Sequence, residues 1–232
     1  MREIVFDTET TGLDPLQGDR LVEIGCIELV NRFPTGHTFH CYFNPERDMP
    51  TAAFNIHGLS GEFLKDKPLF AQRVDELVAF LGDAPLVAHN AAFDYGFLCA
   101  ELERVQRAVL VRERLVDTLL LARRKHPAGP NRLDDLCARY GIDNSRRTKH
   151  GALLDAEILA EVYVELIGAR QATLILVETV EGAGPQRNGA TSTRARPAPL
   201  AARLTDAERE AHRKFVATLG KDALWREYLP GE

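Results

Sequence analysis

Two acidic residues lie two positions apart where an apolar stretch near the start of the chain ends. Asp7 and Glu9 stand in the run FDTETTG, which extends from Phe6 to Gly12. Side chains alternate between the two faces of a strand, so both carboxylates are expected on the same side. Neighbouring carboxylates repel each other unless a proton or a cation relieves them, and Mg²⁺ prefers oxygen ligands of this kind. The spacing favours a divalent-cation site, while two solvated acids on an exposed strand are the alternative for this motif alone.

Another acid, Asp94, ends the run HNAAFD, which follows a short apolar stretch. Asn90 is suited to begin a helix as its N-cap, which places Asp94 one turn into that helix. An acid in the first turn is also favoured by the helix dipole, and Phe93 suits either the core or stacking on a base. Taken alone, this motif does not separate a functional acid from a structural one.

A histidine and an acid five positions apart open a long, mostly apolar stretch. His150 comes just before it, and Asp155 interrupts its apolar residues. A carboxylate among apolar neighbours needs a partner, and a histidine can take a proton from water near pH 7. The alternative is a capping histidine with a first-turn acid. The basic residues beside His150, namely Arg146, Arg147 and Lys149, suit either contacts to backbone phosphates or a solvated loop.

The elements that must position these side chains follow a definite order along the chain. Three early strands with short connections suit a meander, and short extended segments then alternate with helices. The extended segments are expected at Glu3–Thr8, Leu21–Val30, His37–Phe43, Pro85–Ala88 and Leu115–Asp117. The helices are expected from about Pro68 to Leu81 and at Ala92–Val105, Thr118–Lys125, Arg132–Tyr140 and Gly151–Ile167. This order predicts an α/β fold with a mixed sheet covered by helices, which suits a ribonuclease-H-like architecture without by itself selecting it.

The composition is that of an ordinary globular protein, with 45% hydrophobic and 27% charged residues among 232. A net charge of −5 argues against a protein that coats nucleic acid through long-range attraction. An enzyme that grips only a strand end remains compatible, because bound cations can bridge carboxylates to phosphate. The four cysteines show no metal-binding spacing, so buried free thiols are expected. Neither a signal peptide nor a membrane-spanning run is recognised, so a cytoplasmic protein is expected.

The composition changes after Glu181. Residues 182–203 contain three prolines, three glycines, four arginines and no acidic residue, which is typical of a flexible linker. Thr205 then suits a helix N-cap, and Glu208 completes a capping box for a helix over residues 206–219. The sequence therefore predicts three parts: a main domain at 1–180, a linker at 181–204 and a helical tail at 205–232.

Together these motifs resemble a known family, the DEDD exonucleases of the histidine-bearing subclass (DEDDh). The resemblance covers nearly all of residues 1–180 and rests on FDTETTG, IHGLS at Ile56–Ser60, HNAAFD, and RTKHGALLDAEILAEVY at Arg147–Tyr163. Within the family the chain is most similar to the proofreading (epsilon) subunits of bacterial DNA polymerase III. Its tail is also similar to theirs, in Asp206-Ala207-Glu208-x3-His212 and in Leu224-Trp225. The resemblance implies a ribonuclease-H-like mixed five-stranded sheet flanked by helices.

The resemblance also implies metal-dependent 3′→5′ hydrolysis of DNA that releases 5′-mononucleotides. Two divalent ions, Mg²⁺ or Mn²⁺, would stabilise the attacking and the leaving oxygen. Asp7, Glu9 and Asp155 would hold one ion, with Asp7 shared between both. Asp94 would act on the second ion directly or through water, and His150 would deprotonate the attacking water.

The same match implies contacts to substrate and partners. Thr10 would approach the terminal nucleotide, Ile56 and His57 would border its sugar or base, and Asn90 and Phe93 would line the path of the strand. The implied partners are a single-stranded or frayed DNA 3′ end and the polymerase III alpha subunit, bound through residues 205–232. Residues 177–182 read VETVEG, without the glutamine-led hydrophobic motif that binds the sliding clamp in many such subunits. Direct clamp binding is therefore left open.

Two other functions fit parts of the sequence. A stand-alone exoribonuclease or oligonucleotide trimmer would use the same site, although the tail favours DNA replication. A non-catalytic subunit that binds a polymerase through its tail is the other, and the complete set of five site residues argues against that as the sole role. Digestion of matched RNA and DNA oligonucleotides distinguishes the first alternative from a DNA exonuclease. A nuclease assay of Asp7→Ala distinguishes the second, because a non-catalytic subunit has no activity to lose.

Overall fold

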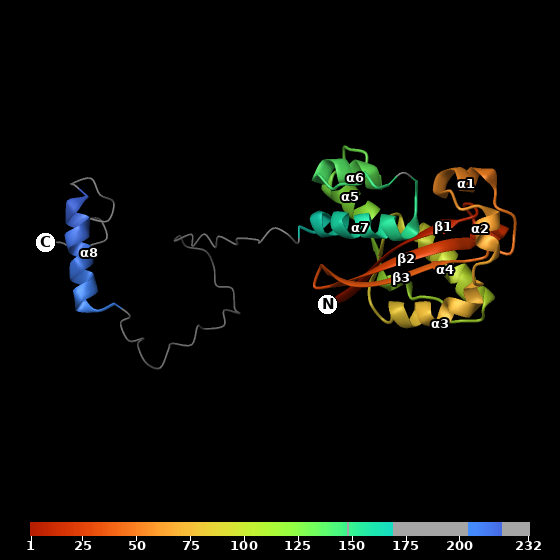
Figure 1. Ribbon diagram of the computed structural model, residues 1–232, viewed down its shortest axis with the longest axis horizontal. Helices are drawn as coiled ribbons and strands as arrows, with labels where there is room; N and C mark the ends of the chain where they lie inside the picture. The colour runs from red at the N-terminus through yellow and green to blue at the C-terminus, as the bar shows by residue number, and fades with distance from the viewer. Residues whose placement is uncertain (148, 169–203, 220–232) are drawn as a thin grey trace, which may run out of the picture. The chain divides into compact units, whose positions relative to one another are not determined.

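The computed structural model describes residues 1–147, 149–168 and 204–219. Its centre is a five-stranded mixed sheet with the order β3-β2-β1-β4-β5 (Figure 1). The strands are β1 (Arg2–Thr10), β2 (Leu21–Val30), β3 (Phe33–Tyr42), β4 (Leu86–Ala88) and β5 (Leu115–Asp117). The first three form an antiparallel meander, and β4 and β5 run parallel to β1. The expected mixed sheet, flanked by helices, is confirmed.

One face of the sheet is covered by α3 (Phe70–Leu81) and α4 (Ala91–Arg104). Because side chains alternate along a strand, Ile4 and Phe6 of β1 both point to this face and are fully buried there. They pack in one hydrophobic cluster with residues of both helices. This layer therefore anchors the start of α4 beside the end of β1.

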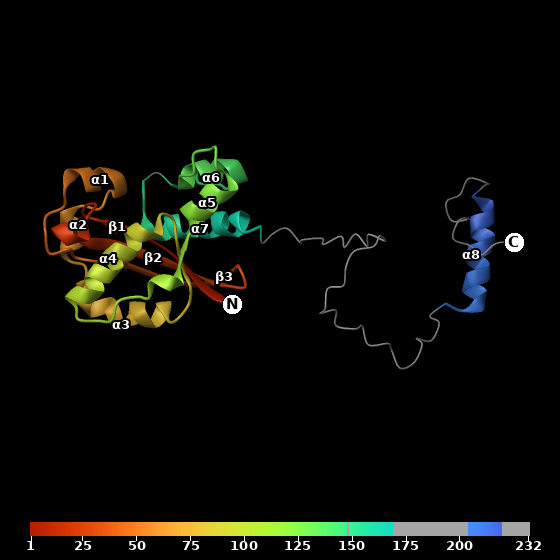
Figure 2. The ribbon, with the colours of Figure 1, turned by 180° about the vertical axis from the view of Figure 1, so that it is seen from behind.

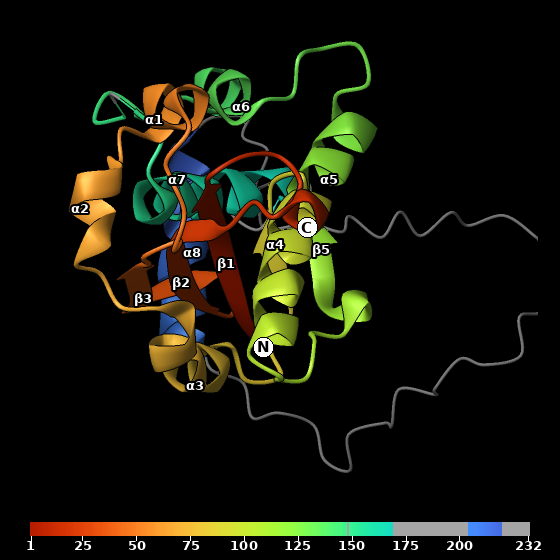
Figure 3. The same ribbon diagram turned by 90° about the vertical axis from the view of Figure 1, so that its right-hand side faces the viewer.

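The opposite face is covered by α5 (Thr118–Lys125), α6 (Leu133–Tyr140) and α7 (Ala152–Leu166). Val5, which alternates with Ile4 and Phe6, belongs to this second cluster. Figure 3 shows α7 and α3 on different sides of the strands. The central strands β1 and β4 are thus buried on both faces, and the odd-numbered side chains of β1 face α7.

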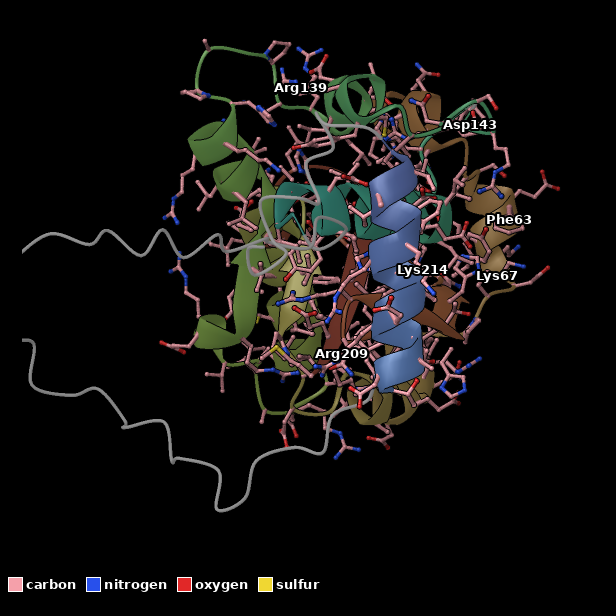
Figure 4. All side chains as sticks on the ribbon, turned by 90° about the vertical axis from the view of Figure 1, so that its left-hand side faces the viewer. Phe63, Lys67, Arg139, Asp143, Arg209 and Lys214 are labelled. Atoms are coloured by element: carbon pink, nitrogen blue, oxygen red, sulfur yellow. The ribbon has the colours of Figure 1, made fainter. Side chains whose placement is uncertain are left out.

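Two short helices that the sequence analysis did not predict lie at the end of the sheet where β1 ends (Figures 1 and 2). They are α1 (Thr51–His57) and α2 (Gly61–Lys65). Their connection to the sheet is aromatic, because the Phe63 ring meets the Tyr42 ring at 5.1 Å between centroids. The Lys67 Nζ lies 4.1 Å from the centre of the Phe63 ring, and Figure 4 shows both side chains together. These contacts hold α2 against the end of β3. Two short 3₁₀ turns, Pro15–Gln17 and Arg112–Arg114, complete the order of elements.

The hairpin between β2 and β3 is tighter than expected, and β3 begins at Phe33 where the sequence analysis predicted His37. Asn31 and Arg32 both have positive φ, 52° and 74°, as a two-residue hairpin turn requires. Arginine is unusual at the second position, which is why the sequence showed no turn signal. Its guanidinium forms an ion pair with buried Glu3, which helps to hold this backbone conformation.

The helix α8 (Asp206–Thr218) is described by itself. Thr205 begins it with the predicted capping box, in which Oγ1 accepts from the Glu208 amide and Glu208 accepts from the Thr205 amide. The predicted linker up to residue 203 and the end of the tail with Leu224 and Trp225 lie outside the described residues. Residues 177–182, discussed above for the clamp, do so as well. No helix in the described ranges combines the length and apolar character needed to span a bilayer.

Candidate nuclease active site

The end of β1 brings Asp7 and Glu9 to the face covered by α7. In the register of β1 with β2, Asp7 lies opposite Gly25 and Glu9 lies opposite Glu23. Glu23 is itself buried and bonds to His40 Nε2 at 2.7 Å. A register shift follows directly after Glu9, where the ladder is interrupted. The predicted side-by-side arrangement of the first two acids is therefore present.

Asp155 reaches the same place because α7 begins directly on the sheet. A Cβ atom at Gly25 would lie 2.3 Å from both the backbone nitrogen and the Cα of Leu153, so only glycine permits this approach. Asp155 is 2% exposed. Ligand atoms of Glu9, His150 and Asp155 lie within 4.8 Å of one another, a spacing suited to a metal ion.

Asp94 arrives from the other side of the sheet, in the first turn of α4. It accepts a hydrogen bond of 2.6 Å from Thr8 Oγ1, whose side chain lies between those of Asp7 and Glu9 in sequence but points to the α4 face. Asn90 occupies the N-cap position of α4, as predicted, but its side chain makes no capping bond. Its backbone adopts a left-handed conformation, and its backbone amide donates to Asp117 Oδ1 at 3.2 Å.

The positive charge near these acids is too small to offset their burial and their mutual repulsion. Burial, reinforced by Asp94, Glu9 and Asp155, raises the pKa of Asp7 well above its usual value. Burial also raises the pKa of Glu9 to about 8 and that of Asp94 to about 7. A divalent cation would remove this penalty, because it favours the ionised form of each carboxylate. The residues present therefore fit a site for divalent cations.

His150 stands at the opening of this cluster, with 49% of its side chain exposed. Its Nδ1 lies 3.2 Å from Asp155 Oδ2. Arg147 is the unexpected member: the sequence analysis left it between a phosphate contact and a solvated loop. The structure instead buries it against Asp155, with 8% of the side chain exposed. Burial alone would raise the pKa of Asp155, but hydrogen bonds from His150 and Arg147 lower it.

A cleft of about 810 Å³ opens over the carboxylates. Asp7, Asp155 and His150 line one part of it. It continues past Asn90 to Arg123 and Arg132. Acidic and basic side chains therefore line one cleft, and the arginines among them suit contacts to the phosphates of a strand.

The other predicted substrate residues lie at the end of β1, at the end of α1 and in the first turn of α4. Ile56 is exposed and His57 is buried, and both lie at the end of α1. Thr10 is buried, with its hydroxyl donating to the Gly12 carbonyl at 2.6 Å. The partly buried Phe93 packs on Phe97 with ring centroids 5.0 Å apart. The structure places these four residues outside the lining of the cleft described above.

The loop before α7 joins these residues to the histidine. The His150 amide donates to the Ile56 carbonyl at 3.4 Å. The Lys149 Nζ lies 5.1 Å from the centre of the Phe54 ring. Sequence reasoning missed this connection between α1 and the loop, as it missed the roles of Thr8 and Gly25. The only sequence signal was the position of Gly25 inside the predicted strand Leu21–Val30, because a glycine within a strand indicates a close backbone approach.

The raised carboxyl pKa values predict how the stability of the metal-free protein depends on pH. Glu9 and Asp94 bind protons more tightly when folded, with pKa values of about 8 and about 7 against ordinary values of 4.5 and 3.8. The free energy of unfolding therefore falls as pH rises through this window. We expect the Tm in EDTA to fall between about pH 5 and 8, and Mg²⁺ or Mn²⁺ to restore it most at the upper end. In Glu9→Gln the decline should be shallower. A metal-free Tm that stays level or rises over this range would contradict the expectation.

Comparison with known proteins agrees with this geometry. The family model described as "Exonuclease" (RNase_T) matches residues 4–163. DNA polymerase III subunit epsilon of Rickettsia felis is 47% identical over 226 residues, which cover 96% of this chain and 99% of that protein. The subunit of the same name from Escherichia coli K12 is 42% identical over 240 residues, covering 97% of each. The solved nuclease domain of 3′hExo, a DEDDh family member bound to rAMP, superimposes with a TM-score of 0.62 at 16% identity. That match covers 72% of this chain and 92% of the other, and it shows the fold.

Proposed function

Because this chain belongs to the exonuclease family, we propose that it is the proofreading 3′→5′ exonuclease of bacterial DNA polymerase III. It removes nucleotides from the 3′ end of DNA as 5′-mononucleotides. Its similarity to proteins named DNA polymerase III subunit epsilon extends over 96% and 97% of its length, well beyond the region that the family model matches. Replication in bacteria takes place in the cytoplasm, and the protein would act there.

The observation that carries this proposal is the meeting of four carboxylates from three elements. Asp7 and Glu9 come from β1, Asp94 from α4 and Asp155 from α7. Burial raises the pKa values of three of them, Asp7, Glu9 and Asp94, and perturbed carboxyl groups of this kind cluster at functional sites. Buried carboxylates at the mouth of a cleft can hold divalent cations, and these cations can in turn bind the phosphate of a substrate.

Two divalent cations, Mg²⁺ or Mn²⁺, would supply charge stabilisation for the attacking and the leaving oxygen. The residues that hold them in this proposal are Asp7, Glu9, Asp94 and Asp155. Thr8 orients Asp94 through its 2.6 Å hydrogen bond, and Gly25 lets α7 deliver Asp155. The protein therefore contributes rigid placement of the ligands from both faces of the sheet.

His150 is the general base in this proposal. Half of its side chain is exposed, so it has access to water, and it also touches Asp155. An imidazole in this position can take a proton from the attacking water near neutral pH. The hydrogen bond from the His150 backbone amide to the Ile56 carbonyl couples the position of His150 to α1, where the terminal nucleotide is assigned.

The substrate lies on two sides of the carboxylates in this assignment. Thr10, Ile56 and His57 border the terminal nucleotide. His57 Nε2 is buried near the Thr10 backbone, but among the described residues it has no well-formed hydrogen bond. A sugar or base can supply the missing partner. Asn90 and Phe93 line the strand, and the phosphates on its 5′ side follow the cleft toward Arg123 and Arg132.

A terminal mispair provides the test of proofreading. With Mg²⁺ present, a primer with a mispaired 3′ end should be digested about tenfold faster than a paired one, since freeing a paired terminus costs a few kcal/mol. EDTA should stop both reactions, and the product should carry a 5′ phosphate. Matched RNA oligonucleotides are the second arm, because the neighbour 3′hExo binds the ribonucleotide rAMP. Equal digestion of paired and mispaired ends, or faster digestion of RNA, would contradict the assignment.

The tail is assigned to binding of the polymerase alpha subunit. Phe215 of α8 and Leu219, which directly follows the helix, expose apolar side chains, as expected of a helix that binds a partner. A tethered nuclease needs little affinity of its own for DNA, which suits the negative net charge. Removal of residues 205–232 should abolish co-elution with the alpha subunit and spare digestion of free oligonucleotides. Loss of digestion in that shortened chain would argue against a tail that serves only as a tether.

A further inference from the structure

Arg147 contributes a positive charge directly to the carboxylate cluster. Its Nε and Nη2 donate to the two oxygens of Asp155 at 2.5 and 2.7 Å. Nη2 also lies 2.7 Å from His150 Nδ1, and Nη1 donates to Asp134 at 2.7 Å. All three nitrogens of the guanidinium are therefore bonded to groups of the cleft.

This arrangement differs from that of the neighbouring arginine. Arg146 is 70% exposed and reaches Glu157 only at 3.7 Å, as in many weak surface ion pairs. Arg147 is 8% exposed and meets Asp155 through two parallel bonds, the geometry in which arginine binds a carboxylate most firmly. The two residues carry the same charge, but of these two only Arg147 contacts the carboxylate cluster.

The guanidinium lies against the Asp155 carboxylate, which the proposed function assigns as a ligand of a divalent cation. It is bonded to both Asp155 oxygens and to His150, and these two residues are among the three whose ligand atoms lie within 4.8 Å of one another. A fixed monovalent cation and a divalent ion on the same carboxylate repel each other. Occupation of the site by one therefore weakens binding of the other.

Resting on the proposed function, we propose that Arg147 is a positioning residue that acts as an internal counter-ion. In the metal-free protein it holds Asp155 and His150 in place, and it is displaced when the divalent cation binds. Its Nη2 also lies against His150 Nδ1, so displacement of the guanidinium by the cation would remove a contact that holds the imidazole ring in place.

The experiment compares Arg147→Gln with Arg146→Gln, which removes the same charge from the adjacent exposed position. Mn²⁺ affinity is measured by isothermal titration calorimetry on the full chain, and the Tm is measured in EDTA and in saturating Mn²⁺. For Arg147→Gln we expect Mn²⁺ to bind about tenfold more tightly, within the range usual for coupled sites. Its Tm should fall more in EDTA than in Mn²⁺, whereas Arg146→Gln should change neither quantity.

Weaker Mn²⁺ binding by Arg147→Gln would overturn the proposal, because it would show that Arg147 supports the loaded site. Equal losses of Tm in both conditions with unchanged affinity would also overturn it, since they indicate a purely structural residue. Failure of the unaltered protein to bind Mn²⁺ at all would instead count against the proposed function.

A measurement on the unaltered protein covers the case in which Arg147→Gln does not fold. The Arg147 Nε–H group is buried and bonded, so its NMR signal should be protected from exchange with water in EDTA. Titration with Mg²⁺ should remove that protection and shift the His150 ring signals at the same cation concentration. Protection of Nε–H that persists in saturating Mg²⁺ would overturn the displacement.

Discussion

Replacement of His150 by glutamine is expected to lower the turnover of a single-stranded DNA oligonucleotide by about 10²–10⁴-fold at saturating Mg²⁺. Glutamine retains a hydrogen-bonding side chain but cannot take a proton from water. The KM should change much less than kcat, because the loss concerns proton transfer and not the grip on the strand. Steady-state kinetics of nucleotide release measure both quantities.

The Mn²⁺ affinity of the same variant decides between two roles for the histidine. Ligand atoms of His150, Glu9 and Asp155 are close enough to share an ion. If His150 is the base, the dissociation constant for Mn²⁺ should stay within about threefold of its original value, since no ligand is lost. A loss of affinity that parallels the loss of turnover would make it a ligand instead. His37→Gln is a suitable control, because that side chain is 78% exposed and, among the described residues, pairs with Glu28 alone.

Replacement of Gly25 by alanine is expected to destabilise the protein by about 1–3 kcal/mol. The added Cβ would lie 2.3 Å from the backbone of Leu153, and backbone cannot rotate away as a side chain can. The start of α7 must therefore move off the sheet, and Asp155 moves with it. A fall in Tm of about 2–4 °C per kcal/mol is expected for a chain of this size.

The activity of Gly25→Ala should fall further than its stability suggests. Displacement of a metal ligand by about 1 Å can cost 10²-fold in rate, so kcat and Mn²⁺ affinity should both decline even where the protein is fully folded. Gly96→Ala is the matched control. Gly96 lies within α4 with no atom within 4 Å of the added Cβ, so alanine there should stabilise the helix by about 0.5–1 kcal/mol. Full activity in folded Gly25→Ala would show that the close approach of α7 is not needed to place Asp155.

Much of the fold could be predicted because its elements have strong local patterns. Three predicted segments, Leu21–Val30, Leu115–Asp117 and Thr118–Lys125, agree with the structure residue for residue. α1 and α2 were missed because helices this short have little propensity of their own and depend on tertiary contacts.

By itself, the sequence determined which side chains are able to bind cations and move a proton, and that Asp7 and Glu9 share a face, because strand periodicity is a local property. Only the tertiary structure decided how far apart these groups are. Thr8 joins Asp94 across the sheet, Gly25 admits α7, and Arg147 enters the acidic cluster. Each of these contacts links residues that meet only once the helices pack on the two faces of the sheet. Packing distances and the burial of charge arise from that assembly, so no local pattern contains them.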